Sequence, residues 1–152
     1  MFLCAEGDRD RAQELQDHIE GKLRKVAEMR TITGILAEDR DVGWALRDSD
    51  CVVLIASHQA LSLIQNKQQE TKGNFVTFDG KMIHEELEAN PELVKDKLVI
   101  IFLREQTEND WIPTGFDARK IFHLQGQKIK RGNPALSHLE HWNSQILGVN
   151  RL

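Results

Sequence analysis

The chain has 152 residues, 40% of them hydrophobic and 29% charged, and it carries a formal net charge of −4. This length suits a single domain with its own hydrophobic core, and the composition is that of an ordinary globular protein. Membrane-spanning, secreted and disulfide-framework proteins are disfavoured, because no apolar run approaches about 20 residues, no basic-then-apolar signal opens the chain, and there are only two cysteines.

The first 50 residues alternate short apolar runs with a segment of helical period. Residues 2–5 (FLCA) are apolar and too few for a helix, so they predict a strand. Between residues 12 and 26, apolar side chains recur at steps of three and four, which predicts a helix. Residues 31–36 are mostly β-branched and predict a second strand. After the charged loop AEDRD, residues 41–49 predict a short helix.

Two runs have the character of central strands in a parallel sheet. Residues 51–57 (CVVLIAS) and 97–103 (KLVIIFL) are apolar almost without interruption, as in strands covered by helices on both faces. Residues 58–77 lie between them. This segment starts with a helical turn or two and continues into the polar run QNKQQETKGN, so we expect an exposed insertion. Residues 78–90 predict another helix.

The end of the chain completes this alternation. Residues 104–115 predict a long loop, residues 120–125 (KIFHLQ) predict a strand near the sheet edge, and Pro134 suits the first turn of a last helix. Strands that alternate with helices predict a parallel sheet with helices on both faces. We therefore expect an α/β, flavodoxin-like three-layer fold with a five-stranded, mainly parallel sheet, in a single domain over residues 1–152.

The usual phosphate-binding and nucleophile motifs are missing. The first predicted strand leads into CAEGDRD, where one glycine stands beside acidic residues that would repel a pyrophosphate. The chain has neither a P-loop nor a G-x-S-x-G elbow, which disfavours P-loop enzymes and α/β-hydrolases. Its predicted central strands end in Ser57 and in Arg104 and Glu105 rather than in a phosphoacceptor aspartate, which disfavours a receiver domain.

The histidines and cysteines do not form a recognisable metal site. His138 and His141 are three residues apart on the last predicted helix, a spacing that can place two ligands side by side. No third ligand lies nearby in the sequence, so we expect no metal and no required cofactor. Cys4 and Cys51 fall in predicted core strands, where a thiol acts as a small hydrophobic group. This cysteine usage fits a reducing interior, and we expect a cytoplasmic protein.

Three glutamates, Glu85, Glu86 and Glu88, fall on the predicted helix between the two central strands. Ligands of an open parallel sheet bind outside the carboxyl ends of its strands. A glutamate beside that crevice could bond ribose hydroxyls or stabilise a developing oxocarbenium ion. The alternative is that all three form the solvent-facing side of an amphipathic helix, and the spacing alone favours this alternative.

Charge is unevenly distributed along the chain. Residues 1–50 carry 12 acidic and 8 basic side chains, residues 51–118 carry 11 and 6, and residues 119–152 carry 1 and 6. Such a split is usually a local excess on a solvated surface. The other interpretation is docking between copies, since opposite patches steer association. Nucleic acid is a weaker expectation, because the basic run QKIKRGN has no interleaved aromatic residue and the whole chain is negative.

Four segments, taken in order, resemble the TIR domain and its SEFIR relatives. They are FLCAEGDRDRAQELQDHI, WALRDSDCVVLIASHQAL, KLVIIFLRE and WIPTGFDARKIFHLQ. The second is the most specific, because TIR domains typically show a short helix, a small-polar pair and then a fully apolar strand that closes in Ser. SEFIR domains also lengthen the segment that follows, so both names stay open.

The resemblance implies a signalling domain that self-associates with like TIR or SEFIR domains, in innate immunity. Because the chain begins directly in its first predicted strand, we expect it to be one domain of a larger protein, and without a long apolar run we expect no direct membrane insertion. In these families the loop after the second strand and the neighbouring helices form the contacts. The basic run near the C-terminus would supply the complementary charge. The implied interface residues are Ala37, Glu38, Asp39, Arg40, Asp41, Val42, Gly43, Lys128, Lys130 and Arg131.

The alternative that the resemblance implies is an NAD⁺ glycohydrolase, which cleaves NAD⁺ to nicotinamide and ADP-ribose or a cyclic form once copies assemble. The segment KMIHEEL is similar to the catalytic helix of such domains and places Glu86 in the catalytic position, with Glu85 as second choice. The expected substrate-binding residues are Ala5, Glu6 and Trp44. A third interpretation, a nucleoside deoxyribosyltransferase-like enzyme, is supported by fold analogy alone.

Overall fold

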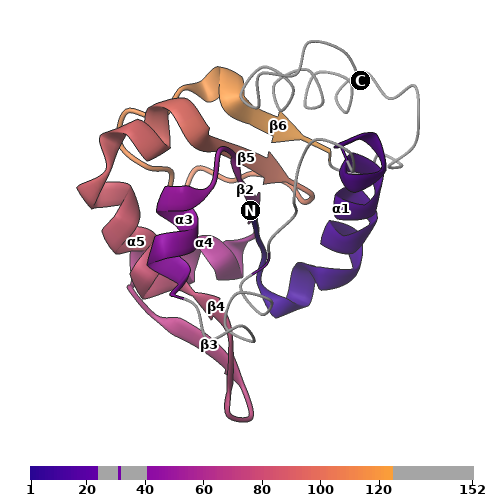
Figure 1. Cartoon of the computed structure of the whole chain (residues 1–152), viewed down its shortest axis with the longest axis horizontal. Coiled ribbons are helices and arrows are strands. Elements are labelled where there is room, and N and C mark those ends of the chain that lie inside the picture. The colour runs from indigo at the N-terminus through magenta and orange to yellow at the C-terminus, as the bar shows by residue number, and fades with distance from the viewer. Residues whose placement is uncertain (24–30, 32–40, 125–152) are drawn as a thin grey trace.

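The computed structural model describes residues 1–23, 31 and 41–124 (Figure 1). The described elements are β1 (Phe2–Leu3), the 3-10 turn η1 (Glu6–Asp8), α1 (Arg9–Leu23), α3 (Val42–Asp48), β2 (Val52–Ala56), α4 (His58–Gln65), β3 (Gln69–Lys72), β4 (Phe75–Asp79), α5 (Gly80–Ala89), the π-helical turn η2 (Leu93–Lys97), β5 (Leu98–Phe102), the 3-10 turn η3 (Ala118–Lys120) and β6 (Ile121–His123).

The main sheet is parallel and has the order β1-β2-β5-β6 in the described part of the chain. This confirms the predicted α/β fold with a mainly parallel sheet, although with four strands. Phe2 also forms a parallel bridge to Thr31. Because β2 occupies one side of β1, Thr31 lies on the other side, where a flavodoxin-like order places the second strand. The rest of the predicted strand 31–36 lies outside the described residues.

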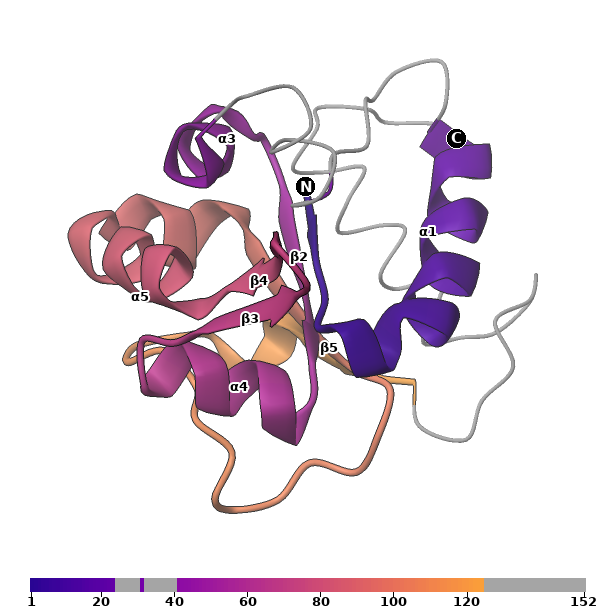
Figure 2. The ribbon, with the colours of Figure 1, turned by 90° about the horizontal axis from the view of Figure 1, so that it is seen from below.

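The strands β2 and β5 are the two central strands of the described sheet, as their unbroken apolar sequences predicted. Every residue of both strands is buried, and the two pair in register from Val52 with Leu98 to Ala56 with Phe102. Strands with apolar side chains on both faces need a helical layer on each side. Figure 2 shows these layers, with α3, α4 and α5 on one face of the sheet and α1 on the other.

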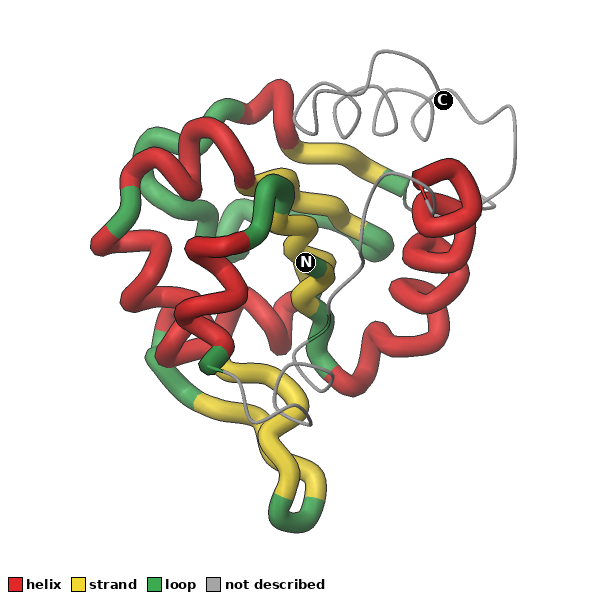
Figure 3. The backbone as a smooth tube through the Cα atoms, in the orientation of Figure 1, coloured by secondary structure: helices red, strands yellow, loops and turns green. Residues whose placement is uncertain are grey.

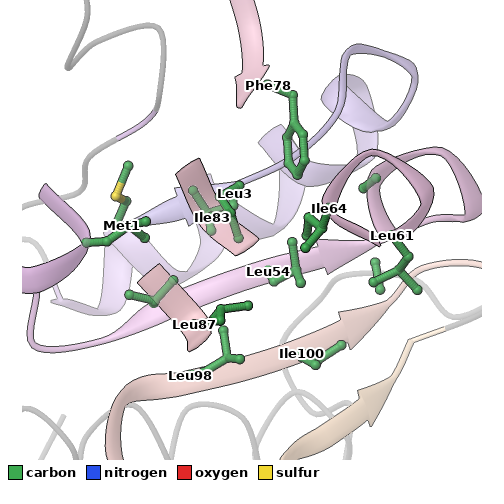
Figure 4. Packing of buried hydrophobic residues seen from close by; sticks show 14 of the residues in the cluster. Met1, Leu3, Leu54, Leu61, Ile64, Phe78, Ile83, Leu87, Leu98 and Ile100 are labelled. Carbon is green, nitrogen blue, oxygen red and sulfur yellow. The ribbon is translucent and has the colours of Figure 1, made fainter. Parts of the chain in front are cut away.

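Successive side chains of the strands point to opposite faces of the sheet and belong to two separate hydrophobic clusters. Leu54 and Ile100 join the larger cluster, which includes Leu61 and Ile64 of α4 and Ile83 of α5 (Figure 4). On the opposite face, the smaller cluster takes side chains from all four strands and from α1. The buried α1 members of this second cluster are Ala12, Leu15 and Ile19, which were spaced for a helix in the sequence.

The segment 58–77 is only partly the exposed insertion that we expected. Its first half is the helix α4, whose buried residues include Leu61 and Ile64. The prediction of an exposed insertion is therefore wrong for this half. Its second half contributes to an antiparallel hairpin, β3–β4, that extends from the body of the molecule (Figure 3). Gly73 begins the two-residue turn with a φ of 61°, as a type II′ turn requires. The hairpin is anchored by Phe78, which is fully buried.

The predictions for the second half of the chain are confirmed up to β6, and those beyond it lie outside the described residues. The loop after β5 and the edge strand β6 are confirmed. The predicted helix after Pro134, with His138 and His141, lies outside the described residues, as do the predicted interface residues 37–40 and the basic run 128–131. Across the segments that the structure describes, no helix is long and apolar enough to cross a membrane.

Candidate functional site

The carboxyl edge of the sheet gathers the polar segments that follow its strands. After β1 the chain enters Cys4, Ala5 and Glu6 before α1 begins. After β2, the Ser57 hydroxyl accepts a hydrogen bond from the Ala60 N–H at 3.1 Å and caps α4. Parallel strands end at one edge, so these segments meet there, as ligand-binding loops of open α/β sheets do.

A pocket of about 130 Å³ opens beside the end of β1. A cavity of about 150 Å³ holds one benzene ring, so this pocket suits a single ring rather than a dinucleotide. The expected substrate-binding residues Ala5 and Glu6 both line it, and so does Thr77 from the hairpin. The full lining comprises Phe2, Cys4, Ala5, Glu6, Arg9, Ala12, Gln13, Gln16, Thr31 and Thr77.

Next to this pocket, the Glu70 side chain on β3 is hydrogen-bonded to two of the lining residues, Glu6 and Thr77. Its Oε1 accepts hydrogen bonds from the Glu6 N–H and from the Thr77 hydroxyl, both at 2.9 Å. Its Oε2 accepts one from the Gln59 side-chain amide at 2.5 Å. Three donors from three different elements therefore converge on one carboxylate.

The side-chain carboxylate of Glu6 pairs with two cationic side chains. The carboxylate is 3.5 Å from the Arg9 guanidinium and 3.3 Å from the Lys72 ammonium. Arg9 and Lys72 are both well exposed, with side-chain exposures of 51% and 73%. The end of β1 is therefore not the uniformly acidic site that the sequence CAEGDRD suggested.

Glu86 lies elsewhere, between α3 and α5, and it is buried with an exposed fraction of 8%. Its Oε1 accepts a charge-assisted hydrogen bond from the Arg47 guanidinium of α3, and its Oε2 accepts one from the Asn90 side chain at 2.8 Å. A Cβ on Gly43 of α3 would come within 3.0 Å of the same carboxylate. The solvent-facing position considered for this glutamate is therefore wrong, although Glu85 and Glu88 are exposed.

The expected site residues lie in two separate places, the pocket at the end of β1 and the contact between α3 and α5. Ala5 and Glu6 line the pocket at the end of β1. Trp44 is partly buried against the larger hydrophobic cluster from α3, the helix that also supplies the Arg47 partner of Glu86. Among the described residues, the pocket lining includes neither Trp44 nor Glu86.

The described end of the predicted interface loop is mostly interior. Val42 and Gly43 are buried in the first turn of α3, so they are unsuited to the surface contact that we expected of them. Asp41 is exposed, and its carboxylate accepts hydrogen bonds from the Gly43 and Trp44 N–H groups at 3.3 and 3.2 Å. Asp41 is therefore the helix cap, and it is the residue of this trio that a partner could reach.

A histidine and aspartate pair lies at the carboxyl end of β2 and was missed in the sequence. His58 Nδ1 is 2.7 Å from Asp110 Oδ1, and Asp110 Oδ2 accepts a hydrogen bond from the Thr107 N–H at 2.8 Å. The Asp110 side chain is buried while that of His58 is largely exposed. An aspartate held in this way orients an imidazole, but the two residues are 52 positions apart and gave no signal in the sequence.

Both cysteines are at strand boundaries rather than inside strands. Cys4 directly follows β1, Cys51 directly precedes β2, and each is partly buried. Burial raises the pKa of each thiol from 9.0 to about 11. Neutral thiols of this kind are poor nucleophiles. Within residues 1–23, 31 and 41–124, no group of three or more His, Cys, Asp or Glu side chains is arranged to hold a metal ion.

Comparison with known proteins leaves the family open. No protein-family model, no curated protein and no solved structure gives a significant match to this chain.

Proposed function

We propose that this chain is a cytoplasmic interaction domain that self-associates with like domains of TIR or SEFIR type, in innate immune signalling. The observation that carries this proposal is the β3–β4 hairpin, which extends from the body and presents Phe75 at its turn. Phe75 is 76% exposed, and it is the exposed large hydrophobic side chain of the described residues. The edges of a two-stranded hairpin can pair with a strand of another chain, and Phe75 places an apolar side chain beside these edges.

Sedimentation velocity over a concentration series tests this proposal. The wild-type chain is expected to form larger species as its concentration rises. The Phe75→Asp variant should remain monomeric at concentrations where the wild type assembles. Asn74→Asp is the matched control, because it puts the same charge in the same turn and leaves the phenyl ring in place. A wild type that stays monomeric throughout would refute self-association, and equal assembly of both variants would remove the hairpin from the interface.

A second candidate function is NAD⁺ cleavage, and the pocket at the end of β1 is what favours it. Its volume of about 130 Å³ suits a nicotinamide ring, and it is lined by Ala5 and Glu6. In this proposal Glu86 is the catalytic glutamate, with Glu85 as second choice, and assembly brings the catalytic carboxylate to the ring. Glu86 would first have to exchange its hydrogen bonds with Arg47 and Asn90 for the ribose hydroxyls.

Nicotinamide release from NAD⁺ at high protein concentration tests this second candidate. We expect release by the wild type and its loss in Glu86→Gln, which keeps the size of the side chain. Glu88→Gln, at an exposed position of the same helix, serves as the control and should remain active. Loss of release in Glu85→Gln instead of Glu86→Gln would assign the catalytic role to the second choice. No release from a wild-type sample that contains assembled species would rule out this activity and leave the interaction domain as the function.

A further inference from the structure

The Glu70 carboxylate has the partners that an anionic ligand would have at the end of a parallel strand. Its three donors are a backbone amide at the end of β1, a hydroxyl of β4 and a side-chain amide of α4. Hydrogen bonds that an ionised carboxylate accepts are charge-assisted and stronger than those between neutral groups. Glu70 itself comes from the hairpin, which lies between α4 and α5 in the chain and forms a two-stranded sheet separate from the main sheet.

The local irregularity of the hairpin turns one of these donors toward Glu70. The register between β3 and β4 shifts at Glu70, so that Thr77 is an extra residue between Val76 and Phe78. A bulge of this kind re-aims a side chain. The Thr77 hydroxyl bonds both the carbonyl oxygen of Glu70, at 3.2 Å, and its carboxylate.

The pocket adjoins this set of donors directly. Glu6 and Thr77, the two residues that donate to Oε1 of Glu70, also line the 130 Å³ pocket. The pocket has apolar wall residues from β1 and α1, such as Phe2 and Ala12. A ligand with a carboxylate on a small apolar ring could therefore place its charge at the donors and its ring in the pocket.

We propose that the Glu6 N–H, the Thr77 hydroxyl and the Gln59 amide form a binding site for a small aromatic carboxylate. Glu70 is the chain's own occupant of this site. A ligand binds by displacing the Glu70 side chain, and the hairpin loosens as the hydrogen bonds of Glu70 are released. The site does not involve Glu86, but it shares its pocket with the nicotinamide ring of the second candidate function. Benzoate binding can therefore be present whether or not NAD⁺ is cleaved.

Whether the Glu70 side chain or a free carboxylate occupies the three donors depends on the local charge and on the attachment of Glu70 to the chain. The Glu70 carboxylate competes at the high effective concentration of an attached group, so the wild type should bind free carboxylates weakly. Arg9 and Lys72, which pair with Glu6 nearby, add positive charge to this corner of the molecule. Removal of the Glu70 charge therefore both empties the donors and makes the surroundings more favourable for an anion.

Calorimetric titration with benzoate tests the site. The Glu70→Ala variant should bind benzoate about tenfold more tightly than the wild type, since the attached competitor is gone. Addition of Thr77→Val to Glu70→Ala should abolish this gain, because it removes a donor. Addition of Thr71→Val, an exposed threonine of the same hairpin, is the matched control and should leave the gain intact. Equal benzoate affinity in the wild type and Glu70→Ala, or a gain that Thr77→Val leaves unchanged, would overturn the proposal.

Two further measurements keep the proposal testable if Glu70→Ala does not fold. In the wild type, saturating benzoate should speed amide hydrogen exchange in residues 69–79, since binding releases the hairpin. Unchanged or slower exchange there at saturation would contradict displacement. Inorganic phosphate should compete more weakly than benzoate, because it has no ring for the pocket, and equal competition would refute the pocket's part in binding.

Discussion

The carboxylate of Glu86 is satisfied on both oxygens, by Arg47 from α3 and by Asn90 from its own helix. A buried carboxylate with such partners links two elements, and removal of one partner leaves the others without their hydrogen bonds. At its present position Glu86 therefore acts as a tie between α3 and α5. This tie is made between residues 39 positions apart, so no local pattern could indicate it.

Replacement of Glu86 should consequently destabilise the fold. We expect Glu86→Ala to lower the free energy of unfolding by about 1–3 kcal/mol, because it removes two hydrogen bonds and leaves the Asn90 amide unpaired near the interior. The control is Glu85→Ala at the exposed neighbouring position, which should change stability by less than about 0.5 kcal/mol. Urea denaturation of the three proteins measures both effects. Equal stability of Glu86→Ala and the wild type would contradict the buried placement.

The two thiols predict a loss of stability at alkaline pH. Burial raises their pKa to about 11 in the folded chain, while the unfolded chain has the ordinary value of 9.0. Between these values the unfolded state binds fewer protons than the folded state, so the free energy of unfolding falls as pH rises from 9 to 11. Below pH 9 both states hold the protons, and the full contribution is present.

Alkylation by iodoacetamide checks the same pKa values. At pH 8 a thiol with a pKa raised by two units has about one hundredth of the ordinary thiolate fraction, so both cysteines should react far more slowly in the folded chain than in urea. Rapid modification of either cysteine in the folded protein would show that its thiol is not buried as described.

At the level of elements, the junction between the hairpin and α5 depends on one glycine. Gly80 is the first residue of α5, and its N–H donates to the Gln68 carbonyl at 3.0 Å. A Cβ at this position would collide with the carbonyl oxygens of Leu63 and Gln68. Backbone atoms cannot move aside as a flexible side chain would, so only glycine fits this close approach.

Gly80→Ala should therefore cost about 1–3 kcal/mol of stability, as overpacking does, despite the better helix propensity of alanine. Gly7→Ala is the matched control, because the nearest neighbour of its added Cβ, Oε1 of Gln59, lies at an ordinary contact distance of 3.6 Å. Thermal unfolding followed by circular dichroism compares the two variants. A tolerated Gly80→Ala would mean that α4 and α5 are not packed as closely as the structure has them.

Elements with strong local patterns could be predicted from the sequence, while those formed by partners far apart could not. The apolar runs of β2 and β5 and the helical spacing of α1 and α5 were sufficient for the parallel sheet and its layers. The hairpin was missed because β3, with the sequence QETK, is wholly polar, although the Gly73-Asn74 pair was a turn signal. The donors around Glu70 depend on that hairpin, so this part of the candidate site could not be predicted.

At the scale of the whole molecule, the proposed functions differ in what they ask of the hairpin. Self-association uses its exposed tip at Phe75, whereas ligand binding releases the Glu70 side chain at its base. A ligand that loosens the base would also disturb the tip. If both proposals hold, benzoate should shift the sedimentation of the wild type toward smaller species and leave monomeric Phe75→Asp unchanged.

The uneven distribution of charge along the chain predicts that self-association depends on salt concentration. Residues 1–118 carry 23 acidic and 14 basic side chains, whereas residues 119–152 carry 1 and 6. If copies dock through these opposite charges, assembly should weaken as salt rises, since charges are screened beyond about 10 Å at 0.1 M ionic strength. The variant with Lys128, Lys130 and Arg131 changed to Glu should assemble less than the wild type and lose most of its salt dependence.

The control for that variant reverses three lysines in the acidic part of the chain, Lys67, Lys81 and Lys95, which are exposed. It changes the net charge by the same amount but makes the acidic part more acidic, so it should keep or strengthen assembly. Sedimentation velocity at low and high salt compares the three proteins. A general effect of net charge would weaken both variants equally, whereas docking between opposite charges weakens only the first. Unchanged sedimentation of the first variant would leave the apolar hairpin as the remaining basis for self-association.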